Sequence, residues 1–234
     1  MRTAAYSASL VRNSHWSVNP AVQIFTDKQN GDAEFYKNAS WQLGRTTATM
    51  HKALKDLEGT APQAEEVPYD KLIGLLKANG KEDLVARVER IRSQQAREDK
   101  QNGRAPTLTP QRIHGDYHLG QLLYKNGKFI VLDFEGEPTR TLEYRRRLRS
   151  PAADIAGMLR SFAYASAVRG DNNFEQIVTA AFLQGYSEES CIPVPQLKEE
   201  ASPYVLGKAI YEACYELEFR PDWFWIPDAE FERV

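Results

Sequence analysis

The stretch that decides the fold runs from residue 113 to residue 137 and reads IHGDYHLGQLLYKNGKFIVLDFEGE. Its centre, LLYKNGKFIVL, holds Asn126-Gly127 between two apolar runs. This dipeptide supplies the positive φ angles that a two-residue turn between antiparallel strands requires. The pattern predicts a tight β-hairpin, with polar residues gathered just before its first strand and just after its second.

Six further segments carry apolar residues at the spacing of a helix face, and they predict helices. We expect these helices at about 40–58, 68–79, 84–95, 151–165, 173–186 and 203–219. The apolar run AVQIF at 21–25 fits a short strand. The sequence therefore predicts a mainly α fold of α+β type, in which one central hairpin carries the unusual polar residues.

Length and composition are those of a globular chain. It has 234 residues, a hydrophobic fraction of 42% and a formal net charge of -2. These values exclude an intrinsically disordered chain and give no reason to expect nucleic acid as a partner. No apolar run approaches the roughly 20 residues that a membrane span needs, and two cysteines cannot build a disulfide framework. We therefore expect a cytoplasmic protein with no membrane partner, with a poorly defined segment at 1–38 and one domain at 39–234.

The polar residues around the hairpin have the spacing that phosphoryl transfer to an alcohol requires. That reaction needs a carboxylate to accept the alcohol proton, and oxygen ligands that hold Mg²⁺ on the nucleotide phosphates. Kinase-like sites supply them as H-x-D-x-x-x-x-N, followed by a hairpin and D-F-G. Here Asp116 takes the place of the base, Gln121 that of the Asn, and Asp133 that of the metal-binding Asp. Taken singly, Asp116 fits a turn and Asp133 a hairpin cap, but their joint spacing favours the catalytic interpretation.

Two other chemistries are disfavoured by the order of residues along the chain. HGDYH resembles part of a metallophosphoesterase metal cluster, but such sites need histidines farther along, and none follows His118. A serine hydrolase of the usual kind needs a G-x-S-x-G elbow, which the sequence lacks. Cys191 and Cys214 have no histidine near them in the sequence, which favours a place in the core.

Five segments together resemble the bacterial maltokinases and the related glucosamine kinases. HGDYHLGQLL at 114–123, LDFEGEP at 132–138 and EYRRRLRSPAADIAGMLRSFAYA at 143–165 match the central motifs. LGRTTATMHKAL at 43–54 and KAIYEACYELEFRPDWFWIP at 208–227 resemble a helix and the ending of the same family. These are ATP-dependent kinases of the aminoglycoside-phosphotransferase type, and the resemblance implies a protein-kinase-like fold.

The resemblance implies a role for each residue of the central motif. Asp116 would take the proton from the sugar hydroxyl, and Gln121 and Asp133 would hold Mg²⁺ on the co-substrate ATP. For a maltokinase, the main interpretation, the product would be maltose 1-phosphate, which belongs to trehalose and glycogen metabolism. A lobe of the glucosamine kinase type and a non-catalytic sugar-binding or regulatory pseudokinase module are the alternatives.

Sugars are usually held by bidentate polar side chains and aromatic platforms. The residues expected to bind the sugar are His114, Glu135, Glu137, Arg149, Tyr211, Glu212, Tyr215 and Glu216. The last four lie on adjacent faces of one helix through their i, i+4 spacing, and a partly buried amphipathic helix explains them equally well. Asp154 and His118 are expected to support the catalytic segment, Asp154 by accepting backbone N–H groups. Trp223 and Trp225 are expected to anchor the tail.

A complete kinase of this type also has a small β-rich lobe, which the sequence does not show. That lobe supplies a lysine to the nucleotide phosphates and the hinge that binds adenine. Before residue 42 the lysines are Lys28 and Lys37, and no V-A-I-K-like strand is present. We therefore expect the C-terminal lobe only, with the N-lobe absent, and weak or no turnover by the chain alone. The expected partners are a small-molecule sugar and a separate N-lobe or trehalose synthase.

Overall fold

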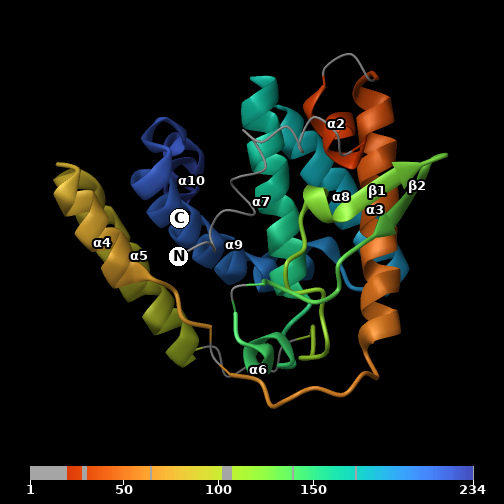
Figure 1. The fold of residues 1–234 in the computed structure, drawn as a ribbon, viewed down its shortest axis with the longest axis horizontal. Coiled ribbons are helices and arrows are strands. Elements are labelled where there is room, and N and C mark those ends of the chain that lie inside the picture. The colour runs from red at the N-terminus through yellow and green to blue at the C-terminus, as the bar shows by residue number, and fades with distance from the viewer. Residues whose placement is uncertain are drawn as a thin grey trace.

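Residues 20–27, 31–63, 65–101, 107–138, 140–171 and 173–233 are described in a computed structural model, and they form helices around one two-stranded sheet (Figure 1). The helices are α2 (Pro20–Thr26), α3 (Ala33–Leu54), α4 (Tyr69–Ala78), α5 (Glu82–Gln101), α6 (Leu142–Arg145), α7 (Ala152–Arg169), α8 (Phe174–Ser190), α9 (Val194–Phe219) and α10 (Trp225–Phe231). The strands are β1 (Leu122–Lys125) and β2 (Lys128–Val131), and two 3₁₀ turns are η1 (Leu119–Gln121) and η2 (Pro221–Trp223). None of the helices within these ranges is both long enough and apolar enough to cross a membrane.

The hairpin predicted from the sequence is present. β1 pairs antiparallel with β2, and Lys125 lies opposite Lys128 next to the turn. Asn126 has a φ of 51° and Gly127 a φ of 75°, as this two-residue connection requires. Phe129 is buried on the inner face of the hairpin. The hairpin returns the chain, so the segment after β2 lies beside the segment before β1.

The segment AVQIF at 21–25, predicted as a strand, is helical and lies in α2. Its buried residues have the spacing of one helix face and are Ala21, Val22, Ile24 and Phe25. The ring of Phe25 packs 5.3 Å from Phe162 and 6.4 Å from Phe129, measured between centroids. The strand prediction is wrong because so short an apolar run carries no period of its own, and packing on α7 and the hairpin decides its conformation. Of the poorly defined segment predicted at 1–38, residues 1–19 and 28–30 lie outside the described residues.

All six segments predicted to be helical are helical, but α3 and α9 begin seven and nine residues earlier than expected. α3 begins at Ala33 because Asp32 Oδ1 accepts a hydrogen bond of 2.9 Å from the backbone N–H of Phe35. α9 begins at Val194, and Pro203, which suits a first helical turn, lies inside the helix instead.

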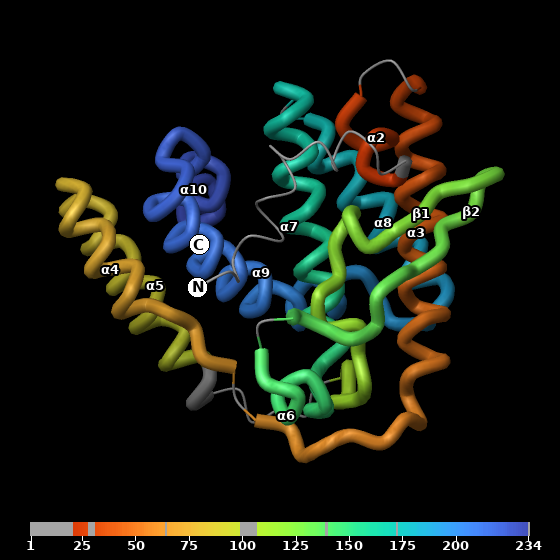
Figure 2. The backbone as a smooth tube through the Cα atoms, viewed as in Figure 1, coloured from red at the N-terminus to blue at the C-terminus, as the bar shows by residue number. Residues whose placement is uncertain are grey.

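Two apolar cores hold the helices together. The first joins α2, α3, α7, α8 and the inner face of the hairpin, and the second joins α4, α5 and α10. α9 belongs to both, since Leu197 and Ala201 lie in the first core and the residues from Leu206 to Leu217 in the second. In Figure 2 the α4–α5 pair lies on one side of the molecule and the group around α7 on the other, with α9 between them.

α3 and α8 make the most intimate contact between two helices. A Cβ atom on Gly44 of α3 would lie 2.0 Å from the carbonyl oxygen of Phe182. A Cβ atom on Gly185 of α8 would lie 2.0 Å from the carbonyl oxygen of Trp41. Both positions therefore require glycine, because any side chain would push the two backbones apart.

Candidate active site

Asp154, at the start of α7, holds the loop that carries the candidate base. Its Oδ2 accepts the backbone N–H of His114 at 2.8 Å, and its Oδ1 accepts the N–H of Gly115 at 2.9 Å. α7 also lies directly beneath the loop, since a Cβ atom on Gly157 would be 2.4 Å from the carbonyl oxygen of Tyr117. The loop conformation is therefore fixed by a buried carboxylate and by contact with a helix.

His51 of α3 completes the environment of Asp154. Its Nε2 lies 3.1 Å from Asp154 Oδ2, and its Nδ1 lies 2.9 Å from the hydroxyl of Tyr186. Burial by itself would raise the pKa of Asp154, but the hydrogen bond and charge of His51, with help from Gly115 N–H, hold this pKa at about 2. Asp154 is therefore an anion at physiological pH and accepts hydrogen bonds only.

His114 links the loop to the segment after β2. Its Nδ1 accepts the backbone N–H of Asp116 at 3.3 Å, so Nε2 carries the proton and donates to the carbonyl oxygen of Leu132 at 2.7 Å. The ring also packs 5.3 Å from Tyr117 and 5.2 Å from Phe134. These contacts give His114 a structural place, and it does not line the cavity described below.

Asp116 and His118 each present one buried polar atom without a hydrogen-bond partner among the described residues: Oδ2 of Asp116 and Nε2 of His118. These two atoms lie 4.0 Å apart. Nδ1 of His118 accepts the N–H of Gly120 at 3.0 Å, which places the proton of the neutral ring on Nε2. Asp116 thus keeps an unused acceptor oxygen, as a residue that takes a proton from a ligand needs.

Burial keeps His118 uncharged. It is the main cause that lowers the pKa of this imidazole to about 4, and the charges of His114 and Lys208 act in the same direction. Asp116 and Asp133 act in the opposite direction, so both carboxylates lie within electrostatic range of one ring. A neutral His118 does not form an ion pair with Asp116, which leaves the charge of Asp116 for a ligand.

The two candidate metal ligands lie on neighbouring segments. The carbonyl oxygen of Gln121 accepts the backbone N–H of Leu132 at 2.9 Å, and Asp133 follows directly. Asp133 is exposed and has a φ of 59°, a left-handed conformation that is costly for a residue other than glycine. An amide oxygen and a carboxylate suit Mg²⁺, which usually takes its other ligands from phosphates and water. Accordingly, no group of three or more His, Cys, Asp or Glu that could hold a metal ion occurs among the described residues.

A cavity of about 150 Å³ opens next to Asp116, a volume that holds a six-membered ring. Of the residues predicted to bind the sugar, Glu137, Arg149, Tyr211 and Glu212 line it, together with Asp116 and His118. We call it the acceptor pocket. Its wall combines aromatic rings with carboxylates and guanidinium groups.

Several residues predicted to bind the sugar lie elsewhere. Glu216 is fully buried and is held by Tyr164 and Arg220, so it cannot reach a ligand in the pocket. Tyr215 stacks on Phe219, with ring centroids 4.8 Å apart, and does not line the pocket. Each lies about one helical turn beyond Tyr211 or Glu212, nearer to η2 than to the cavity.

Two further expectations are corrected by the placement of the side chains. Glu135 does not line the acceptor pocket; it is exposed and pairs with Arg145 at 3.3 Å. Trp225, expected to anchor the tail, is 56% exposed and lies on an outer cavity between α7, α8 and α10. Trp223 is half-buried, with Arg220 above its ring at 5.4 Å.

The acceptor pocket also contains residues that the motifs do not indicate. Glu65 enters from the loop before α4, pairs with Arg149 at 2.5 Å and accepts the hydroxyl of Tyr144 at 3.2 Å. Burial would raise the pKa of Glu65, but the charge and hydrogen bond of Arg149 lower it on balance. Lys208 and Arg160 contribute charges from α9 and α7. Glu65 lies outside the quoted motifs. Arg160 and Lys208 lie within the segments 143–165 and 208–227, but nothing in those segments indicates that the three residues meet at one pocket, because only the fold brings them together.

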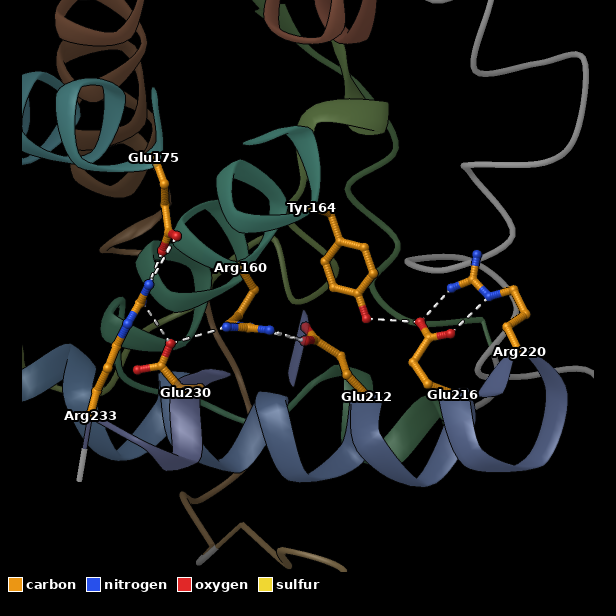
Figure 3. A network of polar contacts seen from close by, with 8 residues as sticks. All are labelled: Arg160, Tyr164, Glu175, Glu212, Glu216, Arg220, Glu230 and Arg233. Carbon is orange, nitrogen blue, oxygen red and sulfur yellow. Dashed lines mark hydrogen bonds and ion pairs between the residues drawn. The ribbon is translucent and has the colours of Figure 1, made fainter. Parts of the chain in front are cut away.

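Figure 3 shows how Glu212 is held. Its Oε2 accepts two hydrogen bonds from Arg160, at 2.9 Å from Nε and 2.7 Å from Nη2. Nη1 of Arg160 reaches Oε2 of Glu230 on α10 at 3.1 Å. Glu212 therefore forms part of the pocket wall with its geometry fixed by a buried guanidinium.

Comparison with known proteins fits this geometry. Residues 26–197 match the phosphotransferase enzyme family, APH. The chain belongs to this family. Among solved structures, a glucosamine kinase in complex with glucosamine, ADP and inorganic phosphate superposes with a TM-score of 0.72 at 22% identity. The match covers 93% of this chain and 56% of that one, and it shows a shared fold. An amicoumacin kinase superposes with a TM-score of 0.50 at 16% identity, over 87% of this chain and 61% of that one.

Two curated relatives are similar in sequence. The glucosamine kinase of Streptacidiphilus jiangxiensis is 25% identical over an alignment of 246 positions, gaps included, that covers 96% of this chain and 55% of that protein. The glucosamine kinase of Mycolicibacterium smegmatis is 27% identical over an alignment of 128 positions, gaps included, that covers 50% of this chain and 32% of that protein. The chain thus spans about half the length of the first of these relatives.

Proposed function

We propose that this chain forms the catalytic and sugar-binding lobe of an ATP-dependent kinase that phosphorylates glucosamine. Membership of the phosphotransferase family supports the reaction class. Both curated relatives described above are glucosamine kinases, which favours glucosamine over the maltose that the sequence motifs first suggest. The observation that carries the proposal is the unpartnered Oδ2 of Asp116 beside the acceptor pocket.

In this proposal the residues of the chain act on the sugar hydroxyl in one displacement. Asp116 accepts the hydroxyl proton as the hydroxyl oxygen bonds to the γ-phosphorus and the bond to ADP breaks. Asp154 and His114 hold the loop in place, so the carboxylate of Asp116 meets the hydroxyl in a fixed orientation. Neutral His118 leaves the charge of Asp116 unpaired until a substrate arrives.

Gln121 and Asp133 are the residues that would hold Mg²⁺ with the phosphates of ATP. Mg²⁺ would supply positive charge that offsets the negative charge on the transferred phosphoryl group. The backbone hydrogen bond between Gln121 and Leu132 keeps the two ligand-bearing segments together. Asp133 follows β2 by two residues and has a left-handed backbone conformation.

The charge of the acceptor pocket suits an amino sugar. Asp116, Glu137 and Glu212 contribute carboxylates to its wall. A protonated amine gains energy from such groups when it is partly removed from water. Maltose carries no charge and is a disaccharide, whereas the cavity has the volume of a single ring.

Ligand-induced changes in thermal unfolding of the purified chain test the proposal. A ligand that binds only the folded state raises its stability by RT ln(1 + [L]/Kd). We expect glucosamine to raise the midpoint without nucleotide, Mg·ATP to raise it separately, and maltose to leave it unchanged. A shift with maltose but none with glucosamine would contradict the choice of acceptor. Binding of glucosamine with no response to Mg·ATP would favour the non-catalytic sugar-binding module.

A further inference from the structure

Figure 3 shows a series of side chains with alternating charges. It begins at Glu212 in the wall of the acceptor pocket and reaches the exposed side chain of Arg233. Glu212 pairs with Arg160, Arg160 with Glu230, Glu230 with Arg233, and Arg233 with Glu175. The distances between paired atoms lie between 2.7 and 3.1 Å. Three carboxylates alternate with two guanidinium groups, so this series of five side chains has a net charge of one negative unit.

Arg160 connects the acceptor pocket to the outer side of the molecule. Its side chain is 4% exposed, and it lines both the acceptor pocket and the outer cavity beside Trp225. Burial alone would lower the pKa of Arg160, but Glu212 and Glu230 raise it well above its usual range. The guanidinium is therefore a permanent charge that two carboxylates on different helices share.

This sharing determines how much of the charge of Glu212 is felt in the pocket. Both bonds from Arg160 fall on Oε2, and no hydrogen bond to Oε1 is formed within the described residues. If Arg160 had Glu212 as its sole partner, the two would form a neutral pair and attract a cation weakly. The negative charge of Glu230 offsets part of the positive charge of Arg160. Arg160 therefore neutralises Glu212 only in part, and a cation in the pocket is attracted by the remaining negative charge.

We propose that Glu230, on α10 and outside the acceptor pocket, is a specificity-determining residue that sets the preference of the pocket for a sugar with a protonated amine over a neutral sugar. The inference rests on the function proposed above, since it assumes that the acceptor binds beside Glu212. The inference gives α10 a role in substrate preference, although no described residue of α10 lines the pocket.

Calorimetric titration of the purified chain with glucosamine and with glucose tests this role. Glucose has the same ring with a hydroxyl group in place of the protonated amine, so the ratio of the two Kd values reports the contribution of the charged group. In Glu230→Gln we expect this ratio to fall by about three- to tenfold, as for one charge lost near a partly buried site. The Kd of glucose is expected to stay within about twofold.

Three matched variants separate charge from structure. Glu216→Gln changes a buried carboxylate on α9 that lies away from the pocket, and we expect it to lower the unfolding midpoint without changing the ratio. Glu175→Gln, at the far end of the series, is expected to leave the ratio unchanged. Arg233→Gln frees Glu230 for Arg160 and is expected to maintain or increase the ratio, even if Glu230→Gln does not fold.

The two proposals fail in different ways. If the unmodified chain binds glucosamine no more tightly than glucose, the proposed acceptor is wrong. If the unmodified chain prefers glucosamine and Glu230→Gln keeps the full preference, the role of Glu230 is wrong. A loss of preference in Arg233→Gln equal to that in Glu230→Gln would also contradict it, because the charge argument gives these variants opposite signs.

Discussion

At the scale of single residues, the site combines a fixed loop with atoms that have no partner. Burying a polar atom without a hydrogen bond costs free energy, yet Asp116 Oδ2 and His118 Nε2 are both buried in this state. Asp154, by contrast, has its oxygens satisfied by two backbone N–H groups and His51. The hydrogen bonds are thus concentrated on Asp154, which supports the loop, whereas Asp116, the residue proposed to react, keeps a carboxylate oxygen without a hydrogen bond.

Replacing Asp116 by Asn tests this division. Starting from the weak turnover expected of the chain alone, we expect Asp116→Asn to lower phosphoryl transfer by at least about 10²-fold, the usual contribution of a general base. The unfolding midpoint should not fall, because the carboxylate Oδ2 makes no hydrogen bond that would be lost. Coupled ADP-release assays and calorimetry measure the two effects. Asp70→Asn, at an 85% exposed side chain on α4, is the control and should change neither. A variant that retains full transfer would refute the assignment of the base.

The low pKa of Asp154 makes stability depend on pH in a defined window. The pKa is about 2 in the folded state and near 3.8 in the unfolded state, so the unfolded state binds the proton more readily. The carboxylate therefore contributes stability above about pH 4, and about 2 kcal/mol of it is lost as the pH falls toward 2.

Urea unfolding of Asp154→Asn and of the unmodified chain at several pH values measures this contribution. We expect the difference in unfolding free energy to be largest above pH 4 and to shrink as the pH falls toward 2. Asp32→Asn, which keeps a good helix cap at the start of α3, should leave stability nearly unchanged. A difference that does not vary with pH would show that the charge of Asp154 contributes nothing.

At the scale of secondary structure, the contact between α3 and α8 fixes the position of His51 over Asp154. We expect Gly44→Ala to lower stability by about 1–3 kcal/mol, the usual range for overpacking, since its Cβ would meet the carbonyl oxygen of Phe182. Gly74→Ala is the matched control: its Cβ meets nothing within 4 Å on exposed α4. It should raise stability by about 0.5–1 kcal/mol. Denaturant unfolding of both variants is the measurement, and equal effects would contradict the close contact.

The elements differ in how far the sequence predicts them. The hairpin is predicted well because Asn126-Gly127 encodes its turn locally through two positive φ angles. The helical conformation of residues 21–25 and the start of α9 are not predicted, because packing against other elements outweighs the local preference of these segments. Pro203 illustrates this point: its sequence signal is that of a first turn, but burial on both sides of it, at Ala201 and Leu206, extends the helix past it.

At the scale of the whole molecule, the acceptor pocket lies where the two cores meet. One part of its wall comes from the loop at 115–118 and from α7, and another from residues 65–68 and the middle of α9. The motif residues 114–137 are close in sequence and could be predicted together. Glu65, Lys208 and Arg160 could not, because their proximity depends on how α9 packs against both cores.

This arrangement predicts that the two proposed substrates, glucosamine and Mg·ATP, protect different parts of the chain from hydrogen exchange. In the proposed complex, glucosamine bridges segments from both cores, so we expect slower exchange at 65–68, 113–118 and 204–212. Mg·ATP should instead slow exchange around Gln121 and Asp133, within 121–134. The first two turns of α5, which do not line the pocket, should be unaffected by either ligand and serve as an internal control.

Exchange measured by mass spectrometry with each ligand alone, and with both, decides between these patterns. Protection of the same segments by both ligands would mean that the acceptor pocket is a nucleotide site and that the proposed division is wrong. Protection confined to one core by glucosamine would mean that the sugar does not bridge the wall formed by Glu65 and α9. Separate protection by each ligand, with additive protection when both are present, is the result that a displacement between two bound substrates requires, since the sugar hydroxyl and the γ-phosphate must occupy the site together.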